Sequence, residues 1–109
     1  MEIPAFPFSI SDFATIAADI HAGETGYAEW KTIHRGNVRI RLVTYSAGYL
    51  ADHWCNKGHI IFCVEGSMET ELQNGQKHLL EKGMLYTVGD NSAAHRSYSK
   101  SGCVLFIVD

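Results

Sequence analysis

The recurrence of turn residues most constrains what this chain can fold into. From residue 26 onward, short runs of β-branched and aromatic residues alternate about every ten residues with clusters of Gly, Asn, Asp and Ser. Asn74-Gly75 is the clearest turn, because both central positions of a type I′ hairpin need positive φ. No helical stripe of useful length interrupts the series, so the pattern predicts an all-β sandwich or barrel.

The chain is expected to form a single domain over residues 1–109, long enough to bury a core. Residues 1–22 are expected to be an apolar N-terminal arm that prolines keep extended. The predicted strands are 27–33, 38–46, 60–64, 68–72, 77–80, 84–88, 95–99 and 103–108. Both faces of 60–64 are apolar, so this strand is expected at the centre of a sheet.

Composition and charge argue against several classes of partner. Nine Lys and Arg against twelve Asp and Glu give a net charge of -3 without a basic cluster, which disfavours nucleic acid and anionic membranes. No apolar run approaches the roughly 20 residues of a membrane span, and the first residues lack the basic start of a signal peptide. We therefore predict a cytoplasmic protein. The cysteines, Cys55, Cys63 and Cys103, lack framework spacing and are expected to be reduced.

A cluster of metal-ligating side chains precedes the predicted central strand. His53, Cys55 and His59 lie within seven residues, and imidazole and thiolate are strong ligands for transition metals. His53 and Cys55 would share a face of an extended strand, whereas His59 on an unbroken strand would lie about 20 Å beyond His53. We therefore expect a turn at Asn56-Lys57-Gly58 that folds His59 back beside the other two.

Several polar residues have two interpretations. In the run 38–42, Arg39 and Arg41 alternate with apolar residues, so they lie either on a solvated face or inside a pocket. Asp52 either orients a neighbouring histidine or caps the loop. Cys63 and Cys103 are interpreted as buried hydrophobic residues rather than ligands.

Two blocks of this sequence resemble the cupin superfamily of small β-barrels. Residues 48–66 match the first cupin block, in which His-x-His precedes Glu or Gln and a hydrophobic strand that ends in Gly. Residues 83–95 match the second block, a Gly followed by a hydrophobic strand, a turn and a His. More narrowly, residues 49–55 resemble small single-domain cupins with an Asp-His-Cys-Trp motif, although the order here is Asp-His-Trp-Cys.

The resemblance implies a single-domain jelly-roll barrel that holds a metal through His53, Cys55, His59 and His95. Cys55 stands where most metal-binding cupins have a second His, and His59 stands where they have Glu or Gln. This softer, less anionic set favours Zn, Ni, Cu or Fe(II) over Mg and Mn. A closed tetrahedral set would make the metal structural, whereas an open position would admit substrate.

Three functions remain compatible with these residues. The first is a metal-dependent cupin enzyme acting on a small polar molecule inside the barrel. The second is a non-catalytic module that binds a metal or small ligand, or senses one. The third is metal-free chemistry at Cys55, activated by His53 or His95. A homodimer is also expected, because small cupins usually pair and the N-terminal arm is apolar.

Overall fold

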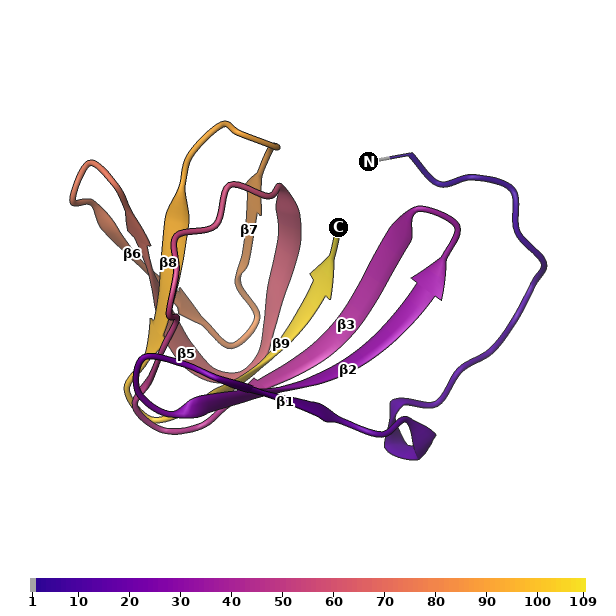
Figure 1. The fold of residues 1–109 in the computed structure, drawn as a ribbon, viewed down its shortest axis with the longest axis horizontal. Helices are drawn as coiled ribbons and strands as arrows, with labels where there is room; N and C mark the ends of the chain where they lie inside the picture. Colours follow the sequence, from indigo (N-terminus) through magenta and orange to yellow (C-terminus); the bar gives the residue numbers. More distant parts are fainter. Residues whose placement is uncertain (1) are drawn as a thin grey trace.

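The structure is a computed structural model that describes residues 2–109, and its strands form a curled half-barrel (Figure 1). A 3-10 helix, η1, is capped by the Asp12 side chain, which accepts a hydrogen bond from Ala14 N. No helix within residues 2–109 has the length and apolar character that a bilayer crossing requires. The elements are η1 (Phe13–Thr15), β1 (Asp19–Ala22), β2 (Tyr27–Arg35), β3 (Val38–Tyr45), β4 (Tyr49–Leu50), β5 (His59–Leu72), β6 (Lys77–Glu81), β7 (Leu85–Val88), β8 (His95–Ser99) and β9 (Cys103–Val108).

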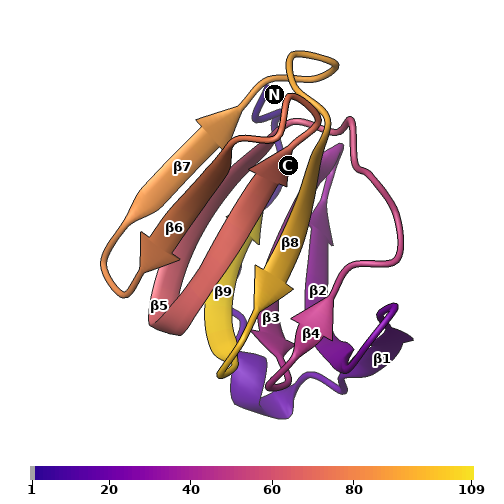
Figure 2. The ribbon, with the colours of Figure 1, turned by 90° about the vertical axis from the view of Figure 1, so that its left-hand side faces the viewer.

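Strand β5 organises the antiparallel sheet, whose order is β1-β2-β3-β9-β5-β8-β4 (Figure 2). Its first part pairs with β9 and β7, and its second part pairs with β8 and β6. The change of partners falls at a bulge between Cys63 and Glu65, next to Gly66. A bulge bends its strand, so β5 passes from one wall of the half-barrel to the other. The predicted central position of this strand is confirmed.

The core lies on the concave face of the curled sheet. Alternate residues of β5 and β9 point into it, and the other residues face outward. Cys63 and Cys103 are buried, as predicted, and burial raises the pKa of the Cys103 thiol to about 11. The main cluster consists of Ala28, Val43, Tyr45, Tyr49, Ile61, Cys63, Met68, Leu80, Cys103, Leu105 and Ile107.

Two predictions for β5 and the hairpin that follows it were wrong. The runs 60–64 and 68–72 are one continuous strand, because the bulge carries the ladder of hydrogen bonds through the intervening residues. The Asn74-Gly75 turn is not type I′. Gly75 has φ +89 but Asn74 is not in the positive-φ region, and Gly75 N donates to Leu72 O. This pattern is typical of a three-residue hairpin loop with a left-handed Gly at its end.

The backbone at the bulge leaves no room for a side chain. Gly66 has φ +74, and a Cβ placed there would collide with the carbonyl oxygen of Gly102. Gly75 also has positive φ, +89, but a Cβ there would meet nothing within 4 Å. Gly66 therefore requires both a left-handed backbone and the absence of a side chain, whereas Gly75 requires only the left-handed backbone.

We predict that Gly66→Ala destabilises the fold more than Gly75→Ala. The left-handed conformation alone costs a substituted residue about 1–2 kcal/mol. The collision at Gly66 adds roughly 1–3 kcal/mol, the usual cost of overpacking. Urea unfolding followed by circular dichroism measures both free energies of unfolding. Equal losses would show that the close approach of Gly66 to Gly102 does not constrain the fold.

Candidate metal centre

Three of the predicted ligands meet at one end of the half-barrel. His59 and His95 are the first residues of β5 and β8, and Cys55 lies in the loop between β4 and β5. Cys55 and His95 exchange two backbone hydrogen bonds, of 2.8 and 3.0 Å, in an isolated bridge. One donor atom from each of the three side chains lies within 4.8 Å of the others.

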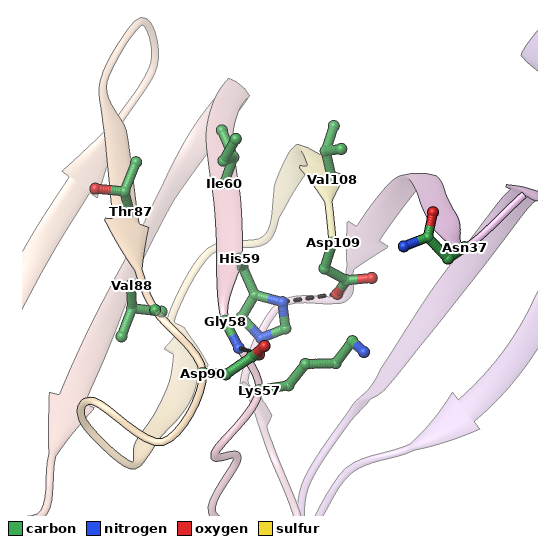
Figure 3. A pocket seen from close by; sticks show the side chains of 11 residues that line it. Asn37, Lys57, Gly58, His59, Ile60, Thr87, Val88, Asp90, Val108 and Asp109 are labelled. Atoms are coloured by element: carbon green, nitrogen blue, oxygen red, sulfur yellow. Dashed lines mark hydrogen bonds and ion pairs between the residues drawn. The ribbon is translucent and has the colours of Figure 1, made fainter. Parts of the chain in front are cut away.

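His59 is oriented by the carboxylate of Asp109. Its Nδ1 lies 2.8 Å from Asp109 Oδ2, as the dashed line in Figure 3 shows. A carboxylate accepts hydrogen bonds, so the proton of a neutral His59 sits on Nδ1. Nε2 then carries a lone pair and lies 3.5 Å from Cys55 Sγ. The histidine therefore presents an acceptor nitrogen to the thiol.

His95 also leaves its Nε2 free to accept, because a backbone carbonyl holds its Nδ1. Its Nδ1 donates a hydrogen bond of 2.8 Å to the backbone carbonyl of Ala93. Its Nε2 is buried and has no hydrogen-bond partner within residues 2–109. Burial lowers the pKa of His95, and nearby His59 lowers it further despite the opposing effect of the carbonyl. A neutral His95 thus holds an unsatisfied lone pair inside the protein.

The donor set fits a transition metal. Two imidazole nitrogens with fixed lone pairs converge with one thiol, and each histidine has its second ring nitrogen held by an oxygen. That arrangement of outer oxygen acceptors is the usual support of metal-bound histidine. A buried acceptor without a partner is unfavourable, and a cation bound at His95 Nε2 would satisfy it. The residues therefore suit a divalent metal on chemical grounds.

His53, the fourth predicted ligand, is placed outside this group. Its side chain is 74% exposed, and its Nδ1 lies 2.6 Å from Asp52 Oδ1. Asp52 is also exposed, so of the two roles considered for it, it orients a neighbouring histidine that faces solvent. The ligand assignment of His53 remains a prediction without support from this arrangement.

The expected turn at residues 56–58 is absent, and this explains the position of His53. Cys55 pairs with His95 of β8 rather than with the start of β5. Two hydrogen bonds then tie the loop to the β7–β8 connection, from Asn91 N to Asn56 O at 2.8 Å and from Gly58 N to Asp90 Oδ1 at 2.7 Å. The predicted turn was wrong, although the predicted meeting of Cys55 with His59 is present.

Asp109 is the functional residue that the sequence did not reveal. Its side chain is 1% exposed and accepts hydrogen bonds from both Arg39 and Arg41 as well as His59. Burial favours its neutral form, but the hydrogen bonds from His59 and Arg39 and the two guanidinium charges outweigh that effect. Its pKa is therefore held well below the ordinary range. No sequence motif connects a carboxylate at residue 109 with a histidine fifty residues earlier.

The arginines of β3 lie inside a pocket, the second of the two interpretations of that strand. Arg41 is 5% exposed at its side chain, and its guanidinium carbon lies 4.4 Å from the ring centroid of Trp30. The cavity has a volume of about 300 Å³. It is lined by Trp30, Arg39, Arg41, Val43, Tyr45, Tyr49, Ala51, His53, Cys55, Lys57, His59, Ile61, Tyr86, His95, Arg96, Ser97 and Ile107. The candidate ligands therefore line a chamber that can hold a small molecule.

A second hollow, of about 610 Å³ (Figure 3), shares part of its lining with the chamber. Lys57 and His59 line both spaces, whereas Asp109 lines only this second hollow. Cys55 and His95 do not line it. The chamber, which all three converging side chains line, is therefore the candidate site.

Comparison with known proteins supports the fold and not a specific activity. No family model matches the sequence. No curated protein matches it significantly.

Solved structures do match the fold. A predicted oxalate decarboxylase from Thermotoga maritima is 11% identical, with a TM-score of 0.78 over 92% of this chain and 96% of its own. Ectoine synthase from P. lautus is 17% identical, with a TM-score of 0.75 over 93% of this chain and 76% of its own. A sugar phosphate isomerase of the cupin superfamily from Silicibacter pomeroyi is 12% identical, with a TM-score of 0.69 over 92% of this chain and 74% of its own. The chain has the cupin fold, and the predicted resemblance is confirmed at that level.

Proposed function

We propose that this protein is a metal-dependent cupin enzyme that acts on a small polar molecule in the chamber. The metal would be held by Cys55, His59 and His95. The observation that carries the proposal is the convergence of one thiol and two imidazole nitrogens within 4.8 Å, with His95 Nε2 buried and without a partner. When bound, the metal would supply Lewis-acid or oxygen-binding chemistry.

The ligand types narrow the metal to a few candidates. A thiolate and two imidazoles are softer than the oxygen donors that Mg and Mn prefer, so Zn, Fe(II), Ni and Cu are the candidates. Coordination deprotonates a thiol, so Cys55 would bind as a thiolate. A divalent ion with one thiolate and two neutral imidazoles carries one residual positive charge. The centre would therefore attract an anionic or strongly polar ligand.

The number of ligands favours an enzyme over a binding module. Structural zinc sites use four protein ligands, whereas catalytic sites use three and leave a position for water or substrate. His53 is 74% exposed and lies outside the converging group, so three such side chains converge within residues 2–109. The open position would face a chamber of about 300 Å³, a size suited to a small metabolite. A cytoplasmic location, predicted from the sequence, is kept as part of the proposal.

We predict that Cys55→Ser, His59→Ala and His95→Ala each weaken zinc binding at least about 100-fold. Loss of a residue that merely supports a ligand costs about 10–100-fold, and loss of the ligand itself costs more. Competition with a chelator measures the affinity, and elemental analysis of protein purified without chelator should give about one metal per chain. Cys55→Ser should also remove the thiolate-to-metal absorption of the cobalt-substituted protein.

His53→Ala is the matched control for these variants. The substitution removes an imidazole that is two residues from Cys55 but exposed, so zinc affinity should stay within about threefold of the unsubstituted protein. Loss of zinc binding in His53→Ala would restore the four-ligand set that the sequence suggested. Full metal retention in the other three variants would refute the proposed centre.

A second function is favoured by a specific contact. Cys55 Sγ lies 3.5 Å from His59 Nε2, and His59 Nδ1 is held by Asp109, so the three residues have the order of a thiol, a base and an orienting carboxylate. Such a set supports metal-free nucleophilic chemistry at Cys55. It leaves His95 Nε2 unused, however, and for this reason the metal centre is preferred.

Alkylation separates the two functions. Iodoacetamide should modify Cys55 in the folded protein and leave Cys63 and Cys103 intact, because both are buried and burial raises the pKa of each thiol. We predict that one equivalent of Zn²⁺ slows alkylation of Cys55 at least about tenfold, since a coordinated thiolate is a poorer nucleophile. Peptide mass spectrometry measures the rate at each cysteine. Equal rates with and without zinc would favour the metal-free alternative.

A homodimer is also part of the proposal, with a second copy covering an apolar row on the outer sheet face. Leu85, Phe62 and Phe106 are aligned in register across β7, β5 and β9, and all three are exposed. The arm, which loops outside the β2–β3 hairpin in Figure 1, exposes Phe8 at 92% and Ile10 at 86%. Contiguous exposed apolar surface of this kind is typical of protein interfaces.

We predict that the protein has twice its chain mass of 12.1 kDa in size-exclusion chromatography with light scattering. Combined Phe8→Ser and Ile10→Ser substitutions should shift it toward the monomer, because burial of these side chains would hold the arm on the partner. Ile20→Ser, at an exposed apolar residue of β1, is the control and should leave the mass unchanged. A dimer that survives the arm substitutions would exclude the arm from the interface.

A further inference from the structure

The chamber contains a buried cation that the protein does not fully satisfy. Arg41 is 5% exposed at its side chain, and its Nε is buried without a hydrogen-bond partner among the residues that the structure describes. Its NH2 group donates to Asp109 Oδ2 at 3.0 Å. A buried guanidinium with a free N–H is unfavourable unless a ligand supplies the missing acceptor.

The charges around Arg41 leave a local excess of positive charge. Asp109 is one carboxylate, and it accepts two hydrogen bonds from Arg39, at 2.8 and 3.0 Å, in addition to those from Arg41 and His59. One side-chain carboxylate therefore serves two guanidinium groups. Within the described part of the chain, the side chains that line the chamber include Arg39, Arg41, Lys57 and Arg96 but no carboxylate.

Arg96 is not the source of this excess. Its guanidinium contacts Glu71 at 2.9 Å and Glu24 at 3.7 Å, so its charge is compensated at the edge of the chamber. Among the described residues, the shared Asp109 is the carboxylate that pairs with Arg41. Trp30 lies over its guanidinium, with 4.4 Å between the guanidinium carbon and the ring centroid. The ring shields the guanidinium face, so a new acceptor must approach the edge, in the plane of the N–H groups.

We propose that the ligand of this chamber is a small organic anion whose carboxylate is held at the edge of Arg41, with the rest of the molecule directed to the Cys55–His59–His95 centre. The proposal rests on the proposed metal site for the second contact but not for the first. Guanidinium and carboxylate are planar and match in a paired hydrogen bond. The chamber volume of about 300 Å³ corresponds to about ten water molecules, which limits the ligand to a small metabolite.

A carboxylate fits better than a phosphate at this position. A carboxylate is planar, so it can lie in the plane of the guanidinium and accept at that edge with both of its oxygens. The free N–H of Arg41 is a single donor at the edge of one planar guanidinium group. A phosphate has three terminal oxygens to satisfy and is typically surrounded by several donors.

The test uses malonate as the probe, its neutral diamide malonamide as the isostere, and inorganic phosphate as the competing anion. Isothermal titration calorimetry measures each on zinc-loaded and on chelator-treated protein. Malonate should bind both forms, and zinc should strengthen its binding. Malonamide and phosphate should each bind at least tenfold more weakly than malonate. Equal binding of malonate and malonamide, or tighter binding of phosphate, would overturn the proposal.

Arg41→Gln should weaken malonate binding at least tenfold, and Arg41→Lys should fall between this variant and the unsubstituted protein, because it keeps the charge but loses the planar fork. Arg35→Gln is the matched control. Arg35 contacts Ser9 and Ser11 on the arm side of β2, outside the chamber, so this variant should bind malonate normally. Unchanged binding in Arg41→Gln would overturn the proposal.

One measurement needs no substitution at the site. In the unsubstituted protein, malonate should shift the ¹⁵N–¹H signal of Arg41 Nε, and the absence of a shift at saturation would overturn the proposal. Zinc stoichiometry is determined on the same samples. If zinc does not bind while malonate does, the metal centre is wrong and the anion site stands. If zinc binds while malonate does not, only the anion site is wrong.

Discussion

The hydrogen-bonded group around Asp109 is the interaction on which the rest of the site depends. One buried carboxylate at the end of β9 accepts from Arg39 and Arg41 of β3 and from His59 of β5. It thereby joins three neighbouring strands by their side chains where β3, β9 and β5 already pair by their backbones. The same carboxylate fixes the proton of His59 on Nδ1 and counters the charge of two buried guanidinium groups. Asp109 therefore supports the sheet, orients the candidate metal ligand His59 and sets the polarity of the chamber.

The fold could be predicted from the sequence because its signals are local. The turn residues and the period of two in the apolar runs predicted most of the strands, and the two apolar faces of residues 60–64 predicted a central strand. The bulge after Cys63 was not predictable, since it lies where Gly66 approaches Gly102, a residue far away in the chain. Residues 19–22, included in the predicted arm, form β1 because they pair with β2, and no local pattern signals that pairing.

The candidate site was predictable to the extent that a motif carried it. The two cupin blocks drew attention to Cys55, His59 and His95, which the fold brings together. Spacing alone suggested a tight turn that would also bring in His53, but Cys55 instead pairs with β8, a contact forty residues away along the chain. Alternation along β3 left the direction of Arg39 and Arg41 open, because polarity alone does not tell a solvated face from a polar chamber. The two arginine side chains point into the chamber because both donate to Asp109, and no sequence pattern associates Asp109 with them.

The three donors sit on elements of different rigidity, and this difference has a kinetic consequence. The two imidazoles begin strands of the sheet, whereas the thiol lies in a loop tied to the next connection by a few hydrogen bonds. Loops of this kind open far more often than the sheet beneath them. An incoming ion would thus bind first to the two preformed imidazole nitrogens and last to the Cys55 sulfur. On release, the bond to the sulfur would break first. Exchange of the bound ion would then follow the opening rate of residues 51–58, not the unfolding rate of the barrel.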